Sequence, residues 1–133
     1  MTSVFADAWY FLALLSRGDA GHEAAARWSR ANARPVMLTE FVLVEVGNTL
    51  ARGPARERFL ELIESLRTDP NTTVVPATHG LVERGLRLFS ERNDKTWSLT
   101  DCISFVVMRD HRITEALTGD HHFEQAGFAI LFT

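Results

Sequence analysis

The chain has 133 residues, of which 46% are hydrophobic and 23% are charged, a composition typical of a soluble globular protein that buries a core. Its net charge of −3 argues against a protein coated in basic residues for gripping nucleic acid, and no apolar run approaches the roughly 20 residues that span a bilayer. The length suits one domain over residues 1–133. The single cysteine, Cys102, excludes an intrachain disulfide, so we expect the protein in the reducing cytoplasm, away from the membrane.

Strand-like and helix-like segments alternate in the first half of the chain. A short strand is expected at residues 3–6, and residues 7–17 then carry apolar side chains at helical spacing. Residues 21–33 predict an alanine-rich helix that ends before a proline. A second strand is expected at residues 35–38, and a helix over residues 39–52 begins at a threonine suited to N-capping.

The same alternation continues to the C-terminus. A helix is expected at residues 55–66, a β-branched strand at Thr72–Val75, a helix at residues 78–91 and a buried helix at residues 99–111. Two last strands are expected at residues 115–118 and 128–132. Such alternation predicts an α/β fold with three α/β/α layers and a central, mostly parallel sheet of about five strands.

Four acidic residues stand at positions where a carboxylate needs an explanation. Asp7 and Asp120 follow expected strands, and Asp101 lies in Ser98-Leu99-Thr100-Asp101, the pattern of a helix capping box. Taken alone, each of the three aspartates is better explained as a helix cap or a turn residue.

Glu45 is the hardest of the four to explain as a structural residue. It interrupts the apolar run of residues 41–46, so we expect its helix to be largely buried and an unpaired Glu45 to be costly. An arginine partner would be the structural explanation, but the sequence identifies none.

The four acids make more sense together than singly. In a parallel sheet, ligands gather at the carboxyl ends of the strands, where Asp7 and Asp120 are expected. Two like charges about 4 Å apart at an effective dielectric near 20 repel by roughly 4 kcal/mol. Convergent carboxylates therefore indicate a neutralising cation, and oxygen ligands favour Mg²⁺ or Mn²⁺.

Four segments resemble the PIN-domain family, and in particular the VapC-type ribonuclease toxins of toxin–antitoxin pairs. These are WSLTDCISF at residues 97–105, ALTGDHHFEQAGF at 116–128, VFADA at 4–8 and EVGNTL at 45–50. The resemblance covers essentially the whole chain. It implies that the four acids Asp7, Glu45, Asp101 and Asp120 form a Mg²⁺ or Mn²⁺ site for hydrolysis of RNA phosphodiester bonds.

The resemblance also distributes roles within this site. Asp7, Asp101 and Asp120 are expected to hold metal, whereas Glu45 is left open between binding metal and orienting the attacking water. Two further polar residues match positions beside the site in the family, and these are Thr118 and Asn48. The pair His121-His122 varies in the family, so we expect it in a surface loop without a metal role.

A toxin of this family implies an RNA substrate, a VapB-type antitoxin and a homodimer. Apolar surface for these partners is expected on the early helices, where Trp9, Tyr10, Phe11 and Trp28 supply large side chains, although core packing explains them equally well. Arginines, which are 13 of the 14 basic residues, are expected at the rim of the site.

Two alternatives within the family remain open from the sequence. The chain could be a nuclease of RNA processing that has no antitoxin, or a catalytically idle binding module. No acid of the expected site is missing, which counts against the idle module. A nucleotide-binding α/β protein is disfavoured, because no glycine-rich phosphate loop follows the first strand.

Overall fold

The computed structural model describes all residues, 1–133, as a five-stranded sheet with seven helices. The strands are β1 (Val4–Ala6), β2 (Val36–Thr39), β3 (Thr72–Val75), β4 (Glu115–Leu117) and β5 (Ala129–Ile130). The helices are α1 (Ala8–Leu15), α2 (His22–Ala31), α3 (Glu40–Thr49), α4 (Pro54–Thr68), α5 (His79–Glu91), α6 (Leu99–Asp110) and α7 (His121–Gln125).

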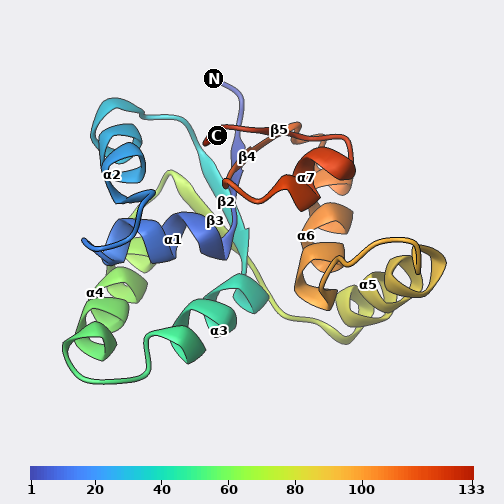
Figure 1. Ribbon diagram of the computed structural model, residues 1–133, viewed down its shortest axis with the longest axis horizontal. Helices are drawn as coiled ribbons and strands as arrows, with labels where there is room; N and C mark the ends of the chain where they lie inside the picture. Colours follow the sequence, from blue (N-terminus) through green and yellow to red (C-terminus); the bar gives the residue numbers. More distant parts are fainter.

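All neighbouring strands pair in parallel, in the order β3-β2-β1-β4-β5 (Figure 1). Strand β1 is central, so the chain first extends the sheet to one side through β2 and β3 and then crosses to the other side with β4 and β5. The predicted α/β class and parallel sheet are confirmed. Because the strand order reverses between β1 and β4, the carboxyl ends of these two strands form the switch point of the sheet.

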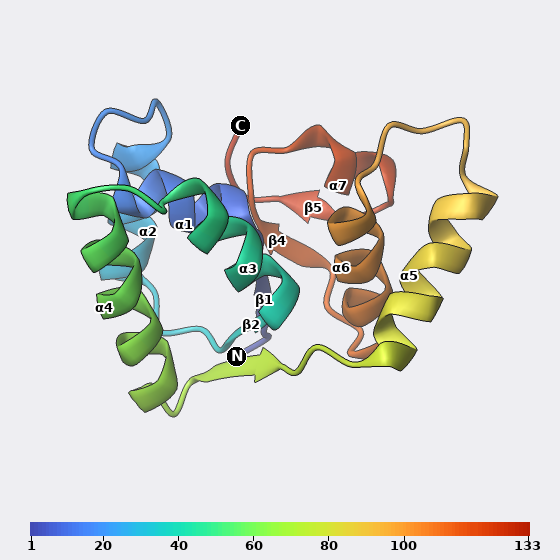
Figure 2. The same ribbon diagram turned by 90° about the horizontal axis from the view of Figure 1, so that it is seen from below.

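The helices form two groups on either side of the sheet (Figures 1 and 2). Helix α1 contacts α2, α3 and α4, whereas α6 contacts α5 and α7. None of the helices has both the length and the apolar content required to cross a bilayer.

The core runs along β1 and helix α6. All three residues of β1 are fully buried, because helices cover both faces of a central parallel strand. Residues 101–108 of α6 are buried without interruption, which confirms the predicted buried helix. Cys102 lies within this stretch, and burial, together with the charge of Asp101, raises the pKa of its thiol. It is therefore a core side chain and not a thiolate nucleophile.

The aromatic residues of the early helices belong mainly to the core and not to an exposed partner surface. Tyr10 and Phe11 are buried, and the Tyr10 ring packs edge-on against Trp28. The Trp9 ring stacks on Phe132 at a centroid distance of 5.3 Å. Core packing therefore accounts for Tyr10 and Phe11, and the half-buried Trp9 and Trp28 also pack against the core.

Helix α3 differs from its expected burial. Only Val42 and Val46 are buried, whereas Val44 is 60% exposed and Glu45 is also exposed. The expectation that an apolar run implies a largely buried helix is wrong here, because α3 packs on β2 and α1 with one face and leaves the other uncovered. The Thr39 hydroxyl does cap α3, accepting a hydrogen bond from the Val42 amide at 3.2 Å.

The close approach of α5 and α6 depends on Gly85. A Cβ atom at this position would lie 2.4 Å from Cγ1 of Ile103, which is far inside van der Waals contact. We expect Gly85→Ala to lower the free energy of unfolding by about 1–3 kcal/mol, as overpacking usually does. Urea denaturation of the purified protein measures this loss.

Gly80→Ala on the same helix is the matched control, because a Cβ there meets nothing closer than the Thr78 hydroxyl at 4.0 Å. Alanine is preferred to glycine in helices by up to about 1 kcal/mol, so this variant should be neutral or slightly more stable. Equal stabilities of the two variants would contradict the packing argument.

Candidate functional site

Two of the four acids are brought together by the register of the sheet. Strands β1 and β4 pair with Ala6 opposite Leu117, so both strands end at the same edge. Asp7 directly follows β1, and Asp120 follows β4 after two residues. Both therefore lie at the switch point, as their positions after strands predicted.

Asp7 is buried, with only 6% of its surface exposed. It occupies the N-cap position of α1, yet its side chain makes no capping hydrogen bond. Instead its Oδ2 accepts a hydrogen bond of 2.8 Å from the Thr118 hydroxyl, whose oxygen accepts another of 3.0 Å from the Asp120 amide. Thr118 thus ties the ends of β1 and β4 together.

Asp101 serves as a cap and also faces the other acids. Its Oδ2 accepts a hydrogen bond of 3.1 Å from the Ser98 amide, and the Ser98 hydroxyl accepts one of 3.0 Å from the Asp101 amide. The predicted capping box is therefore present. The same Oδ2 lies 3.0 Å from Nδ1 of His122, while Oδ1 forms no hydrogen bond within the protein. Capping consequently leaves one oxygen of Asp101 free for a ligand.

Asp120 is the N-cap of α7 and lies at the solvent-exposed edge of the acidic cluster. Its Oδ1 accepts a hydrogen bond of 2.9 Å from the His122 amide, its Oδ2 forms none within the protein, and its side chain is 34% exposed. The preceding Gly119 lets the Trp9 ring pack against this loop, because a Cβ atom at Gly119 would lie 2.7 Å from that ring.

Burial and the charges of neighbouring acids both raise the pKa values of Asp7 and Glu45. Burial is the main cause that raises the pKa of Asp7 to about 7; the Thr118 hydrogen bond opposes this rise, and the charges of Asp101 and Glu45 add to it. The pKa of Glu45 is raised by partial desolvation and by the charges of Asp101 and Asp120. Glu45 is exposed as a residue, but its carboxyl group is part of the same electrostatic cluster.

Sequence reasoning missed His122. The expected surface loop is the helix α7, and its two histidines differ: His121 is exposed beside Glu124, whereas Nδ1 of His122 forms a compact group with carboxylate oxygens of Asp101 and Asp120. These three ligand atoms all lie within 4.8 Å of one another. The one signal in the sequence was that His122 follows Asp120, the capping residue, by two positions.

Asn48 has a less direct relation to the acids. It is exposed on α3, one turn after Glu45, and its side chain makes no hydrogen bond to any of the four acids. The structure therefore places Asp7 and Asp120 at one edge of the sheet, linked through Thr118, and groups carboxylate oxygens of Asp101 and Asp120 with His122. Glu45 is related to these acids through its charge, and Asn48 lies at the margin.

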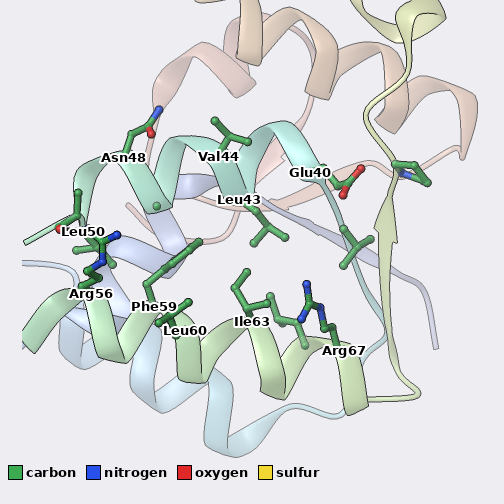
Figure 3. Close-up of a pocket in the computed structure, with 15 residues that line it drawn as sticks. Glu40, Leu43, Val44, Asn48, Leu50, Arg56, Phe59, Leu60, Ile63 and Arg67 are labelled. Atoms are coloured by element: carbon green, nitrogen blue, oxygen red, sulfur yellow. Dashed lines mark hydrogen bonds between the residues drawn. The ribbon is translucent and has the colours of Figure 1, made fainter.

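A concave surface lies away from the acids, between α3 and α4 (Figure 3). It is a groove of about 840 Å³, and none of the four acids lines it. Leu43 and Phe59 point into it from the two helices, and Arg56 and Arg67 lie toward its two ends (Figure 3). Its apolar lining suits contact with an apolar surface better than hydrolysis of a charged phosphodiester.

Comparisons with known proteins agree with this geometry. The PIN-domain family matches residues 4–129. The 23S rRNA-specific endonuclease VapC20 of Mycobacterium tuberculosis, from strains CDC 1551 / Oshkosh and H37Rv, is 30% identical over 125 residues, which cover 94% of this chain and 95% of the relative.

Solved structures show the same fold. The crystal structure of M. tuberculosis VapC20, described as a sarcin–ricin loop cleaving toxin, superposes with a TM-score of 0.86 and 28% identity over 98% of this chain and 99% of that one. FitAcB of Neisseria gonorrhoeae (TM-score 0.68, 16% identity) and a toxin–antitoxin complex of Klebsiella pneumoniae (0.67, 15%) share the fold, each over 96% of this chain and 95% of theirs.

The raised pKa of Asp7 predicts how stability depends on pH when no metal is present. Between its ordinary value of 3.8 and the native value of about 7, the native state holds a proton that the unfolded chain releases. The free energy of unfolding should therefore fall as pH rises through this window, by about 1.4 kcal/mol per pH unit. Urea denaturation in EDTA at several values between pH 4.5 and 8 measures this slope.

Asp7→Asn removes the titrating group while its side-chain oxygen can still accept the Thr118 hydrogen bond. This variant should lose most of the slope and exceed the wild type in stability at pH 8. Asp110→Asn is the control, because its hydrogen bond to Arg84 lowers the pKa of Asp110 below this window. An Asp7→Asn variant that keeps the wild-type slope would show that Asp7 titrates normally.

Proposed function

Because the chain belongs to the PIN-domain family, we propose that it is a metal-dependent endoribonuclease acting as the toxin of a toxin–antitoxin pair. The observation that carries the proposal is the cluster of acids at the switch point of the sheet, where Asp101 and Asp120 face one another and Thr118 links Asp120 to Asp7. The 30% identity to a 23S rRNA-specific endonuclease supports RNA as the substrate and makes ribosomal RNA the first to test. Such a toxin would act in the cytoplasm.

The donor set fits a divalent cation, Mg²⁺ or Mn²⁺. Three aspartates supply hard oxygen donors, and Oδ1 of Asp101 and Oδ2 of Asp120 form no hydrogen bond within the protein. The pKa of about 7 for Asp7 indicates that the cluster needs a positive charge to be fully ionised at neutral pH. When bound, the cation would lower the pKa of a water and stabilise the charge that develops on the attacked phosphate.

The surrounding residues hold these donors in place. Thr118 fixes the rotamer of Asp7, and the capping box with Ser98 fixes that of Asp101. We assign metal binding to Asp7, Asp101 and Asp120. Glu45 approaches from α3 on the exposed side, where it either completes the cation's ligands or orients the attacking water.

Substrate approaches from the side where Glu45 and Asp120 are accessible. The loop between α5 and α6 adjoins this side, because the Thr96 hydroxyl lies 3.3 Å from Nε2 of His122. Lys95 on this loop would offset the negative charge met by an incoming phosphate, whereas the charge of Arg92 is already paired with Asp94. We therefore assign phosphate binding to this loop first among the basic segments.

An antitoxin is the partner that fits the α3–α4 groove. Leu60 and Val44 on its rim are 53% and 60% exposed, which is unusual for apolar side chains that stand together. Arg56 and Arg67 suit a partner with an apolar face flanked by acidic residues. We also propose a homodimer, for which light scattering would give about twice the chain mass of 15.0 kDa.

Asp101→Asn tests the catalytic assignment. Its amide oxygen can still accept the Ser98 hydrogen bond, so the helix cap should survive while a charged donor is lost. Metal-dependent cleavage of ribosomal RNA should fall by about two orders of magnitude or more, since metal ions supply several kcal/mol to such transition states. Growth arrest on expression should disappear in parallel.

Asp110→Asn, at the other end of α6, is the matched control and should cleave RNA like the wild type. Full activity of purified Asp101→Asn would refute the assignment of this cluster as the active site.

Leu60→Asp tests the groove separately from the chemistry. A charge among the apolar side chains that line the groove should weaken antitoxin binding at least tenfold, because a dominant apolar residue of an interface typically contributes about 2 kcal/mol or more. The probe is the antitoxin that a toxin–antitoxin pair would encode in a small open reading frame beside the toxin gene, and calorimetry measures its binding. RNA cleavage by Leu60→Asp should be unchanged.

Leu86→Asp on α5 is the control, because Leu86 is also exposed, at 41%, but lies outside the groove. If Leu60→Asp bound the antitoxin as tightly as Leu86→Asp did, the partner would occupy another surface.

A further inference from the structure

His122 has contacts on both nitrogens of its ring. Nδ1 lies 3.0 Å from Oδ2 of Asp101 and 3.5 Å from Oδ1 of Asp120, and Nε2 lies 3.3 Å from the Thr96 hydroxyl. The side chain is 28% exposed, compared with 74% for His121 next to it. A histidine in this setting is either a positively charged partner of the acids or a ligand of the cation that they hold.

The distances within the group match those between ligands of one metal ion. Two donor atoms about 2.1 Å from the same octahedral ion, in adjacent positions, are about 3.0 Å apart. The two separations from Nδ1, 3.0 and 3.5 Å, are close to this value. One nitrogen and two carboxylate oxygens can therefore face a common ion, because Oδ2 of Asp101 and Oδ1 of Asp120 each accept one amide hydrogen bond and keep a second lone pair. The other oxygen of each carboxylate forms no hydrogen bond within the protein and is also available to the ion.

The other side of the ring has the partner that a metal-binding histidine usually needs. When Nδ1 offers its lone pair to a cation, the proton resides on Nε2 and can be donated to the Thr96 hydroxyl. Thr96 belongs to the loop between α5 and α6, and so it is independent of the acids. It helps to orient the ring and can accept the Nε2 proton in the tautomer that metal binding requires.

The backbone that carries His122 is also held firmly. Phe123 is fully buried, and its ring lies edge-on to Phe105 at 4.9 Å. Trp97 Nε1 donates a hydrogen bond of 3.0 Å to Gln125 on the same short helix. With Asp120 capping its first turn, α7 keeps the imidazole at the acids without requiring metal for its placement.

We propose that Nδ1 of His122 is a direct ligand of the divalent cation bound by Asp101 and Asp120, and that this nitrogen favours Mn²⁺ over Mg²⁺. The inference rests on the metal site of the proposed function. Mg²⁺ prefers oxygen ligands almost exclusively, whereas Mn²⁺ accepts imidazole more readily. A site with three aspartates alone would discriminate less between the two ions.

Electron spin-echo spectroscopy of Mn²⁺ bound to the tag-free protein tests the ligand directly. A nitrogen bound to Mn²⁺ modulates the echo, and labelling the protein with ¹⁵N-histidine should replace the ¹⁴N pattern by that of ¹⁵N. His122→Asn should abolish the histidine-derived modulation, whereas the exposed neighbour variant His121→Asn should retain it.

Calorimetric titration gives the second readout. Loss of a residue that orients a metal ligand commonly costs about 10- to 100-fold in affinity, so loss of the ligand itself in His122→Asn should weaken Mn²⁺ binding at least tenfold and Mg²⁺ binding much less. Thr96→Val leaves the ligand in place, and so it should keep the nitrogen modulation while lowering Mn²⁺ affinity. If His122→Asn folds poorly, Thr96→Val still tests the proposal.

The outcomes separate the two proposals. Mn²⁺ bound to the wild type without histidine modulation would overturn the inference and identify His122 as a charge partner, leaving the nuclease assignment intact. A wild type that binds no Mn²⁺ while Asp101→Asn still cleaves RNA would overturn both.

Discussion

The structure depends on one electrostatic constraint, the crowding of carboxylates at the carboxyl ends of β1 and β4. Pairing of these strands brings Asp7 and Asp120 together, and Thr118 holds both through its hydroxyl. Burial and like charges raise the pKa of Asp7 to about 7, so the fold stabilises an arrangement that the acids themselves oppose. Such an arrangement destabilises the free protein and becomes favourable once a cation is bound.

Helix α3 connects the acidic cluster and the groove to which we assign the two functions. It carries Glu45 toward the acidic cluster, while Leu43 points into the groove shared with α4 (Figure 3). A partner in the groove would therefore contact the helix that holds one of the acids. The exposure of Val44 and Glu45, unexpected from the apolar run, fits the two proposed roles, since a fully buried helix could serve neither.

The sequence predicted what depends on local pattern and missed what depends on the approach of distant elements. Strand β3 has its predicted bounds. The caps at Thr39 and at Ser98 with Asp101 are also present, because a hydroxyl or carboxyl group at a helix start bonds the backbone only three residues away. The burial of α3 was wrong because hydrophobicity does not reveal which face a neighbour leaves open. His122 was missed because its contacts arise only when α7 packs against α6.

The central claim is that the acids form one site whose charge a divalent cation neutralises. Carbon-13 NMR titration of the Asp7 carboxyl group, in the metal-free protein and with saturating Mg²⁺, tests it most directly. We expect a pKa of about 7 without metal and a value far below this with Mg²⁺, since a bound cation favours the ionised form. A pKa near the ordinary 3.8 without metal, or one that Mg²⁺ leaves unchanged, would contradict the account.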